Sequence, residues 1–419
     1  MRVEERRTDV VIVGAGIGGL ACARMLQKAG HKIVLVEAQP AIGGRLQTDA
    51  VDGFLMDRGF QVVPLAYPAA EEMLDYDELA MKRFPPGVRI RAGGRFHILA
   101  DPLREPRYFL RTISSSIGSV GDRFLLLKLA RQVSTIDLER IFSQPEQLVE
   151  DFWRDYGFSR KMVTQFLRPF MAGICLDPEV RVTSRFFKFM VRMFGQGDAA
   201  VPARGMGAIP AYLARDIAPD ALLLNSRVQR LEGTSVHLQS GKKVSARAVV
   251  LAADGPETAR LLGKRPDMQS CREVCFYYGA DQPPVRAPFL TLNGEEFGIV
   301  NSVNFPSMVA SDYAPAGKSL ISAVVPGHPE MDSEEMETTV RGELTDWFGP
   351  SVSEWKLLRT YTIEHALPRP EVPSPDPFQA PIAVGEGIFN CSEYGTMPAT
   401  QWALMSASRV AEAVRAYLS

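Results

Sequence analysis

The sequence of 419 residues has few cysteines, almost no net charge and no long apolar run. Its five cysteines are scattered without a C-x-x-C pair, which disfavours a disulfide scaffold and a zinc site and fits a reducing compartment. Lys and Arg number 47 against 49 Asp and Glu, a formal net charge of -2, so we expect no nucleic-acid partner. No stretch approaches the roughly 20 apolar residues of a membrane span, so no segment is expected to cross a bilayer.

Histidine is also scarce. The five histidines lack metal-ligand spacing and no G-x-S-x-G is present, so we predict no metal site and assign no catalytic residue. Glu364 and His365 form the one adjacent acid–imidazole pair, and we favour a structural role for them. The first residues are mixed in charge and lead into a strand without the apolar core of a signal peptide. We therefore expect a cytoplasmic protein, and peripheral contact with a membrane stays open.

What the sequence does contain is a complete βαβ unit over residues 9–37. A β-branched run leads into G-x-G-x-x-G, a helix with apolar periodicity follows, and a second apolar run ends on Glu37. Gly14 allows the tight turn, Gly16 lets the backbone approach a pyrophosphate, and Gly19 lets the helix pack on the strand. The helix N-terminus attracts phosphate, and Glu37 can accept both hydroxyls of a ribose. The predicted dinucleotide site comprises Gly14, Ala15, Gly16, Gly18, Gly19 and Glu37.

A second motif follows this unit at once. Residues 37–45 read E-A-x-x-x-x-G-G-R, and Gly53, Asp57 and Gly59 form G-x-x-x-D-x-G. Together they resemble the flavoprotein superfamily of amine oxidases, protoporphyrinogen oxidases and phytoene desaturases. This resemblance implies FAD as the cofactor and an α/β fold, in which a Rossmann-like (GR2-type) FAD-binding domain carries a discontinuous α+β substrate domain. It adds five residues to the expected FAD site, namely Ala38, Gly44, Arg45, Gly59 and Phe60.

Later segments carry the same resemblance. Residues 201–215 resemble the turn that returns the family's chain to the FAD domain, and a valine in the strand after it contacts the adenine. Residues 387–395 resemble the run before the last helix, which supplies an acid to the ribityl chain, while the helix start faces the pyrimidine edge of the flavin. The residues implied are Val228, Glu393, Gln401 and Trp402. No cysteine precedes Cys391 in the connector, so noncovalent binding is expected.

Changes in composition along the chain predict five segments. We expect the FAD-binding domain from residues 1–64, 201–265 and 373–419, a helical part of the substrate domain from 65–200, and its sheet from 266–372. Helices are expected at 123–133, 148–156, 161–171, 333–348 and 398–417. Strands are expected at 225–230, 236–238, 244–253, 271–279, 298–305 and 320–325, and a Pro-rich connector at 368–381.

The segment Arg185 to Phe194 places basic residues on one helical face and Phe and Met on another. Three interpretations remain open: a core helix with a solvated basic edge, an apolar wall of the substrate cavity, or a helix on a membrane surface. All three suit a small apolar substrate. Arg168, Tyr394 and Trp402 are further candidates for the cavity lining.

The resemblance implies an FAD-dependent oxidoreductase that transfers a hydride from an apolar substrate, isoprenoid or carotenoid-like or a tetrapyrrole, to flavin N5. Amine oxidation is the alternative; many amine oxidases carry a tyrosine where this chain has Ala399 and a lysine in the strand that corresponds to Arg272–Tyr278, which has none. A flavin-dependent isomerase or saturase, and a non-enzymatic prenyl-binding protein on the same fold, also remain open. The sequence does not predict the oligomeric state.

Overall fold

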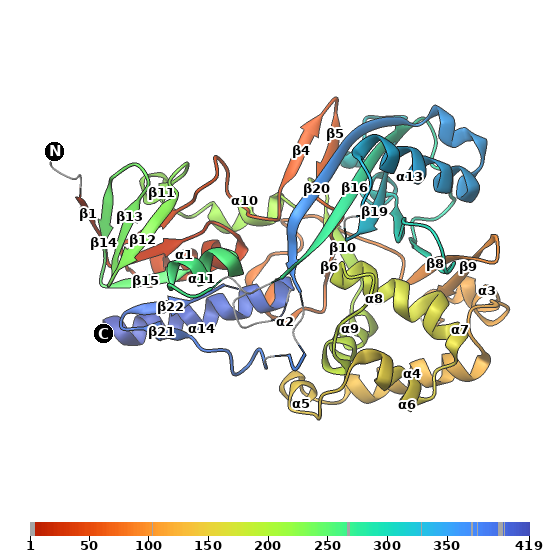
Figure 1. Cartoon of the computed structure of the whole chain (residues 1–419), viewed down its shortest axis with the longest axis horizontal. Coiled ribbons are helices and arrows are strands. Elements are labelled where there is room, and N and C mark those ends of the chain that lie inside the picture. Colours follow the sequence, from red (N-terminus) through yellow and green to blue (C-terminus); the bar gives the residue numbers. More distant parts are fainter. Residues whose placement is uncertain are drawn as a thin grey trace.

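The computed structural model of the chain describes residues 5–102, 104–265, 269–327, 329–369, 372–374, 376–392, 397 and 399–419. These residues form two lobes that lie side by side, with both ends of the chain in the same lobe (Figure 1). The predicted FAD-binding residue Glu393 and the cavity candidate Tyr394 lie outside the described residues.

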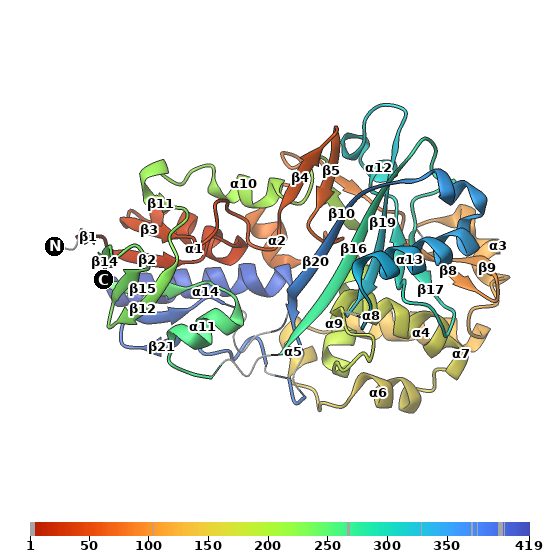
Figure 2. The ribbon, with the colours of Figure 1, turned by 45° about the horizontal axis from the view of Figure 1, so that its top comes forward.

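The lobe that holds both ends is built on a six-stranded sheet. Its strands, in spatial order, are β11 (Leu222–Leu223), β3 (Ile33–Val36), β2 (Val10–Val13), β15 (Ala248–Leu251), β22 (Ile388–Asn390) and β21 (Ala383–Gly385). All neighbours pair in parallel except β21 with β22. The central strands are apolar throughout because both faces are covered. Helices α1 (Ile17–Lys28) and α14 (Thr400–Leu418) pack together over one face (Figure 2).

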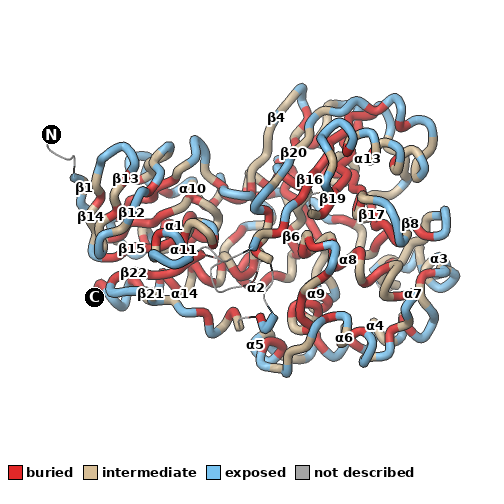
Figure 3. The backbone as a smooth tube through the Cα atoms, in the orientation of Figure 1, coloured by how far each residue is buried: buried red, intermediate tan, exposed pale blue. Residues whose placement is uncertain are grey.

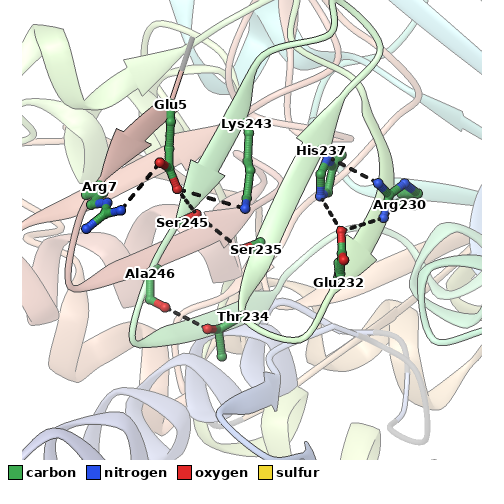
Figure 4. Close-up of polar contacts among 10 residues, drawn as sticks. All are labelled: Glu5, Arg7, Arg230, Glu232, Thr234, Ser235, His237, Lys243, Ser245 and Ala246. Atoms are coloured by element: carbon green, nitrogen blue, oxygen red, sulfur yellow. Dashed lines mark hydrogen bonds and ion pairs between the residues drawn. The ribbon is translucent and has the colours of Figure 1, made fainter. Parts of the chain in front are cut away.

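A smaller sheet covers the other face. It comprises β1 (Glu5–Arg7), β14 (Lys243–Ser245), β13 (Ser235–Leu238) and β12 (Val228–Glu232). Figure 4 shows its polar surface, where Ser245 Oγ donates to Glu5 Oε1 at 2.8 Å and His237 Nε2 lies 3.0 Å from Glu232 Oε2. The strand expected over 244–253 is divided between the two sheets, because the chain crosses from β14 to β15 at Ala246 and Arg247.

The second lobe contains a seven-stranded sheet. Its order is β20 (Lys356–Pro368), β16 (Ser270–Ala280), β19 (Ser319–Pro326), β18 (Ser302–Asn304), β17 (Leu290–Asn293), β8 (Gly87–Ala92) and β9 (Arg95–Ala100). Helix α13 (Ser333–Phe348) covers one face through Met336, Val340 and Leu344. Strands β8 and β9 lie within residues 65–200, which composition predicted to be helical, so this segment also extends the sheet. The Pro-rich connector expected at 368–381 starts where the long strand β20 ends.

The other face of this sheet is closed by helices. They are α4 (Val120–Ser134), α5 (Leu138–Phe142), α6 (Val149–Tyr156), α7 (Arg160–Met162), the π-helix η2 (Val163–Leu167), α8 (Arg168–Cys175) and α9 (Ser184–Gln196). Helix α9 is largely buried (Figure 3), and its basic side chains bond to neighbouring segments: Lys188 Nζ donates to Gln144 Oε1 at 2.7 Å and Arg192 Nη1 to Val133 O at 2.9 Å. The interpretation of this helix as a membrane-surface element is therefore wrong.

Short elements join the lobes. They are β4 (Thr48–Val51), β5 (Phe54–Asp57), β6 (Val63–Pro64), α2 (Pro68–Met73), β7 (Met81–Arg83), β10 (Ala199–Pro202) and α10 (Ala208–Ala214). The other short elements of the fold are η1 (Pro106–Tyr108), α3 (Phe109–Ile113), η3 (Pro219–Ala221), α11 (Gly255–Leu261), α12 (Pro306–Val309), η4 (Ser311–Tyr313) and η5 (Pro350–Glu354). None of the helices in the described part of the chain is both long and apolar enough to cross a membrane.

Asp57 holds this junction together. Its carboxylate accepts hydrogen bonds from Thr48 Oγ1 at 2.5 Å, Tyr313 Oη at 2.7 Å and the backbone N–H of Met206 at 2.8 Å. Burial raises the pKa of Asp57 to about 6, while these three donors act in the opposite direction. The aspartate of the G-x-x-x-D-x-G motif therefore joins a strand, the return turn and the substrate lobe at one point.

Candidate functional site

A cavity of about 1170 Å³ runs between the two lobes. It begins at the glycine-rich loop after β2 and ends among the side chains of α8, α9 and β17. This volume exceeds the roughly 300 to 1,000 Å³ of a site for one small ligand, so the cavity has room for an extended cofactor beside a substrate.

The glycine-rich loop meets the requirements predicted for it. Gly14 has a φ of +105°, and a Cβ there would fall 2.6 Å from the carbonyl oxygen of Ala252. A Cβ on Gly19 would fall 2.0 Å from the carbonyl oxygen of Gly14, so only glycine lets α1 pack this closely. Gly16, in contrast, has open space within 4 Å of its Cβ position and is followed directly by α1 without a side-chain cap. The backbone there is accessible to a phosphate.

Glu37 is fixed at the end of β3 by two backbone donors. Its Oε2 accepts from Ala15 N at 2.7 Å and its Oε1 from Gln39 N at 2.8 Å. Each carboxylate oxygen has a second lone pair, so the group can also accept the hydroxyls of a ribose. Val228 lies on the same cavity wall as Glu37, at the start of β12.

The Gly-Gly-Arg segment lies against the glycine-rich loop. Gly43 N donates to Ala15 O at 2.8 Å, and a Cβ on Gly44 would fall 3.3 Å from the Cα of Gly16. Arg45 follows at the cavity wall, where its Nη1 donates to Ala366 O of β20 at 3.1 Å. The guanidinium is thereby positioned between the two halves of the cavity.

The structure brings most of the predicted FAD-binding residues together. Those that line the cavity are Gly14, Gly16, Gly18, Glu37, Ala38, Gly44, Arg45, Phe60 and Val228. Ala15, Gly19 and Gly59 support this wall from behind through the contacts of their backbone. The arrangement fits FAD, because an open glycine backbone, a helix N-terminus and a ribose acceptor follow one another along one wall.

The first turn of α14 differs from the expectation. Ala399, Thr400 and Ala403 line the cavity, whereas the described contacts of Trp402 and Gln401 lie elsewhere. The indole ring of Trp402 packs 4.9 Å from the ring of Phe189 and 5.1 Å from that of Phe142, measured between centroids. Gln401 Oε1 accepts from Ala69 N at 2.9 Å. Residues three or four apart lie on the same face of a helix, as Ala399, Thr400 and Ala403 do here. Gln401 and Trp402 lie between them in sequence and point to other sides of the helix.

The far end of the cavity is apolar. Helix α9 contributes Phe186, Met190 and Phe194, so the interpretation of this helix as a cavity wall agrees with its position. The facing side chains are Phe170 and Ile174 of α8, Leu176, and Leu290 and Leu292 of β17. Such a surface excludes water and favours an apolar ligand.

Glu273 is a buried acid in the lining of the cavity, next to Gly59 and Ile363, and sequence analysis missed it. It lies on β16 with 3% of its surface exposed, and its Oε2 has no hydrogen-bond partner within the described structure. Burial raises the pKa of Glu273 to about 8. One signal was available: Glu273 alternates with Cys271, Cys275 and Tyr277, which places an acid on a face of the strand that is otherwise buried.

Two more polar side chains lie near the apolar end. Ser302 and Asn304 of β18 line the cavity, and the Oδ1 of Asn304 lacks a hydrogen-bond partner among the described residues although the side chain is buried. Asn304 Oδ1 and Glu273 Oε2 are therefore two buried oxygens without a partner among the described residues, and both side chains line the cavity. Buried acceptors normally have partners, so these atoms indicate that polar groups of a ligand or water complete the site.

Other candidates lie apart from this centre. Glu364 pairs with Arg272 at 3.0 Å, whereas His365 contacts Ser270 Oγ at 2.9 Å and lines the cavity, so the two do not act as a pair. Arg168 forms an ion pair with Glu150. Within the described ranges, no three His, Cys, Asp or Glu side chains gather as metal ligands.

Comparison with known proteins gives consistent results. The profile of the family described as flavin containing amine oxidoreductase matches residues 17–415. A chloroplastic/mitochondrial protoporphyrinogen oxidase 2 from Arabidopsis thaliana is 28% identical over 179 residues, which are 41% of this chain and 33% of that protein. A phytoene dehydrogenase from Streptomyces griseus is 29% identical over 301 residues, 61% of this chain and 56% of that protein. The chain thus spans about a third to about half of these relatives.

A solved structure supports the fold. Wild-type putrescine oxidase bound to putrescine matches with a TM-score of 0.70 at 18% identity, covering 98% of this chain and 100% of that chain. The predicted α/β fold with a Rossmann-like FAD-binding domain and a discontinuous substrate domain is confirmed.

Proposed function

We propose that this chain, which belongs to the family of flavin-containing amine oxidoreductases, is an FAD-dependent oxidoreductase that oxidises an apolar substrate of the isoprenoid, carotenoid-like or tetrapyrrole class. The observation that carries the proposal is the apolar end of the cavity, where side chains of α8, α9 and β17 face one another. Binding there removes a hydrocarbon from water, at about 25 cal/mol for each Å² of apolar surface buried.

Different residues along the cavity would bind the cofactor and the substrate. FAD supplies the acceptor for a hydride from substrate carbon. The open backbone at Gly16 and the carboxylate of Glu37 would hold the dinucleotide, while the apolar wall would orient the substrate and exclude water. Glu273 is neutral below about pH 8, so its carboxyl group can donate a hydrogen bond to a polar group of the substrate and can take up a proton once ionised.

Amine oxidation is the second candidate, and Glu273 is the observation in its favour. A carboxyl group in an apolar cavity can pair with a substrate ammonium. Against it, the wall residue at the expected tyrosine position is Ala399, and β16 contains no lysine. An aromatic cage that would hold a cation is therefore incomplete on this side of the cavity.

Anaerobic mixing separates the candidates. The purified yellow protein is mixed with a polyene, a porphyrinogen and a panel of amines, and loss of flavin absorbance is followed. We expect reduction by the polyene or the porphyrinogen and none by amines; the reverse would overturn the proposal. Substrate turnover without flavin bleaching would instead favour isomerisation, and a chain that binds no FAD would favour the prenyl-binding alternative.

A wall variant makes the test specific. Met190→Gln keeps the length of the side chain but adds an amide to the apolar wall. We expect an increase in KM for the apolar substrate of about tenfold, since about 1.4 kcal/mol of binding corresponds to that factor. FAD content should be unchanged.

A further inference from the structure

A cluster of exposed apolar side chains lies on α3 and α4. Of the eleven large apolar side chains that are exposed among the described residues, six fall between positions 109 and 127. Their exposed fractions run from 45% to 77%, and we call them the α3–α4 patch: Phe109, Leu110, Ile113, Val120, Phe124 and Leu127. Solvent exposure of this many large apolar groups in one place marks an interaction surface.

The patch belongs to a well-anchored part of the fold. Val120, Phe124 and Leu127 recur at helical spacing along the outer side of α4, while Leu129 and Val133 on the inner side are buried. Helix α4 starts with a capping box between Ser119 and Asp122. The exposed stripe is therefore a face of a stable helix.

Arg123 joins the two helices that carry the patch. Its Nη1 donates to Ile113 O at 2.9 Å and its Nη2 to Ile117 O at 3.1 Å. Helix α3 is thereby fixed to the start of α4, and both lie at the end of the molecule opposite the two ends of the chain (Figures 1 and 2).

Cations surround the patch. The stretch 104–131 contains six basic residues and two acidic ones, Glu105 and Asp122, in a chain whose formal net charge is -2. Asp122 is buried and accepts hydrogen bonds from Ser119 and Ser159, so it does not offset the charge at the surface. Arg111, Lys128 and Arg131 are exposed and form no ion pair with any described residue.

We propose that the α3–α4 patch docks the protein on the surface of a membrane that contains anionic lipids. Protruding apolar side chains flanked by Lys and Arg are the features of segments that insert into the headgroup boundary, where the cations meet lipid phosphates. A second copy of the chain is a poorer occupant, because a two-fold contact would bring the same basic residues of both copies together.

The position of the patch relates it to the cavity. The inner side of α4 packs on α9, and α9 supplies Phe186, Met190 and Phe194 to the cavity wall. Two packed helices, α4 and α9, thus separate the docking surface from the apolar end of the cavity. On the proposed function, docking would bring the apolar end of the cavity near a bilayer in which an apolar substrate dissolves; the docking itself does not depend on that substrate class.

The test is vesicle flotation of the full FAD-loaded chain. Vesicles of phosphatidylcholine, with and without phosphatidylserine, are the probes. We expect binding to the anionic vesicles, weak binding to neutral ones, and loss of binding as salt screens the cations. No binding to anionic vesicles at low salt would overturn the proposal.

Variants locate the surface. The triple change Val120→Gln, Phe124→Gln and Leu127→Gln should lower the partition coefficient at least about tenfold, and Arg111→Gln, Lys128→Gln and Arg131→Gln together by about 100-fold. Tyr417→Gln is the matched control, because Tyr417 is 48% exposed at the end of α14 and should leave binding unchanged. An unaltered flavin spectrum in each variant verifies folding.

Two results would contradict the assignment. Equal binding by wild type and both triple variants would remove the patch from the interaction. A dimer that dissociates in the apolar variant, without vesicle binding by the wild type, would identify the patch as a contact between copies. Oxidation of a detergent-solubilised substrate reports on the proposed function separately, since it needs no vesicle.

Discussion

Glu273 and Gly59 are in close contact, and this contact together with the positive φ of Gly59 favours glycine at position 59. A Cβ on Gly59 would fall 1.9 Å from Glu273 Oε1 and 2.8 Å from the Cδ1 of Ile363. Gly59 ends the G-x-x-x-D-x-G motif of the FAD lobe, whereas Glu273 belongs to the sheet of the substrate lobe. The two halves of the cavity are therefore positioned against each other at the acid.

Gly59→Ala should destabilise the protein. The alanine must adopt a φ of +86° and displace the Glu273 side chain. We expect the free energy of unfolding to fall by on the order of 2 to 4 kcal/mol, because the left-handed backbone and the overpacking both act against folding. The loss would be measured as a lower Tm. Adding Glu273→Ala should recover the part due to the clash, and Tm values that show no such recovery would contradict the contact.

Glu273→Gln should raise stability at alkaline pH. The folded protein holds a proton on Glu273 up to about pH 8, whereas the unfolded chain loses it near 4.5, so wild-type stability falls as the pH rises between these values. The amide cannot ionise, so the free energy of unfolding of the variant should match that of the wild type near pH 4.5. Above pH 8 it should exceed the wild-type value by on the order of 5 kcal/mol.

Urea denaturation near pH 4.5 and above pH 8 measures the difference in stability between the wild type and Glu273→Gln. The wild type and the variant share their other buried acids, including Asp57, so the titrations of those acids cancel in the comparison. A difference independent of pH would mean that Glu273 ionises at an ordinary pKa.

Glu37→Ala should reduce FAD occupancy. The substitution removes the acceptor for the ribose and releases Ala15 N and Gln39 N from their hydrogen bonds. We expect affinity for FAD to fall by about 10-fold to 100-fold, corresponding to one or two charge-assisted hydrogen bonds. Arg45→Ala should act in the same direction, and Glu232→Ala, on the outer sheet, serves as the control. The ratio of flavin to protein absorbance is the measurement, and full occupancy in both variants would refute their role.

Trp402→Phe should leave FAD content and substrate turnover unchanged. The ring lies among Phe142, Phe189 and Phe378, and its Nε1 has no hydrogen-bond partner in the described structure. Trp402→Phe should lower the free energy of unfolding by less than about 1.5 kcal/mol, whereas Trp402→Ala should lower it by about 3 to 5 kcal/mol. A large change in the flavin spectrum of Trp402→Phe would place the indole beside the cofactor after all.

Local patterns were sufficient for part of the fold. The βαβ unit over 9–37 could be predicted because its contacts lie within one segment, and α13 has the predicted bounds because its cap and apolar period are both local. The run 244–253 was different: apolar residues continue through it, so nothing in the pattern marks the crossing from one sheet to another. Strands β8 and β9 form a local hairpin that was missed, and only the pairing of β8 with β17, about 200 residues away, places this hairpin in the sheet.

The same distinction applies to the site. Gly16 and Glu37 act within one motif and could be found from it. The direction of the Trp402 side chain depends on how α14 is rotated against α2 and α5, which no local pattern specifies. Glu273 is buried by segments that are distant in sequence, including Gly59 and Ile363, so its altered acidity is a property of the assembled lobes.

The order of strands in the central sheet also governs synthesis of the protein. Strands β2 and β3 emerge early, but β15 begins at Ala248 and its other neighbour β22 at Ile388. At about 5 to 20 residues per second, the first βαβ unit leaves the ribosome on the order of a minute or less before its sheet can be completed. During that interval β2 can pair with β3 but lacks β15 on its other side, so an apolar strand edge stays open. The sheet under the FAD site is complete only after translation has passed β22.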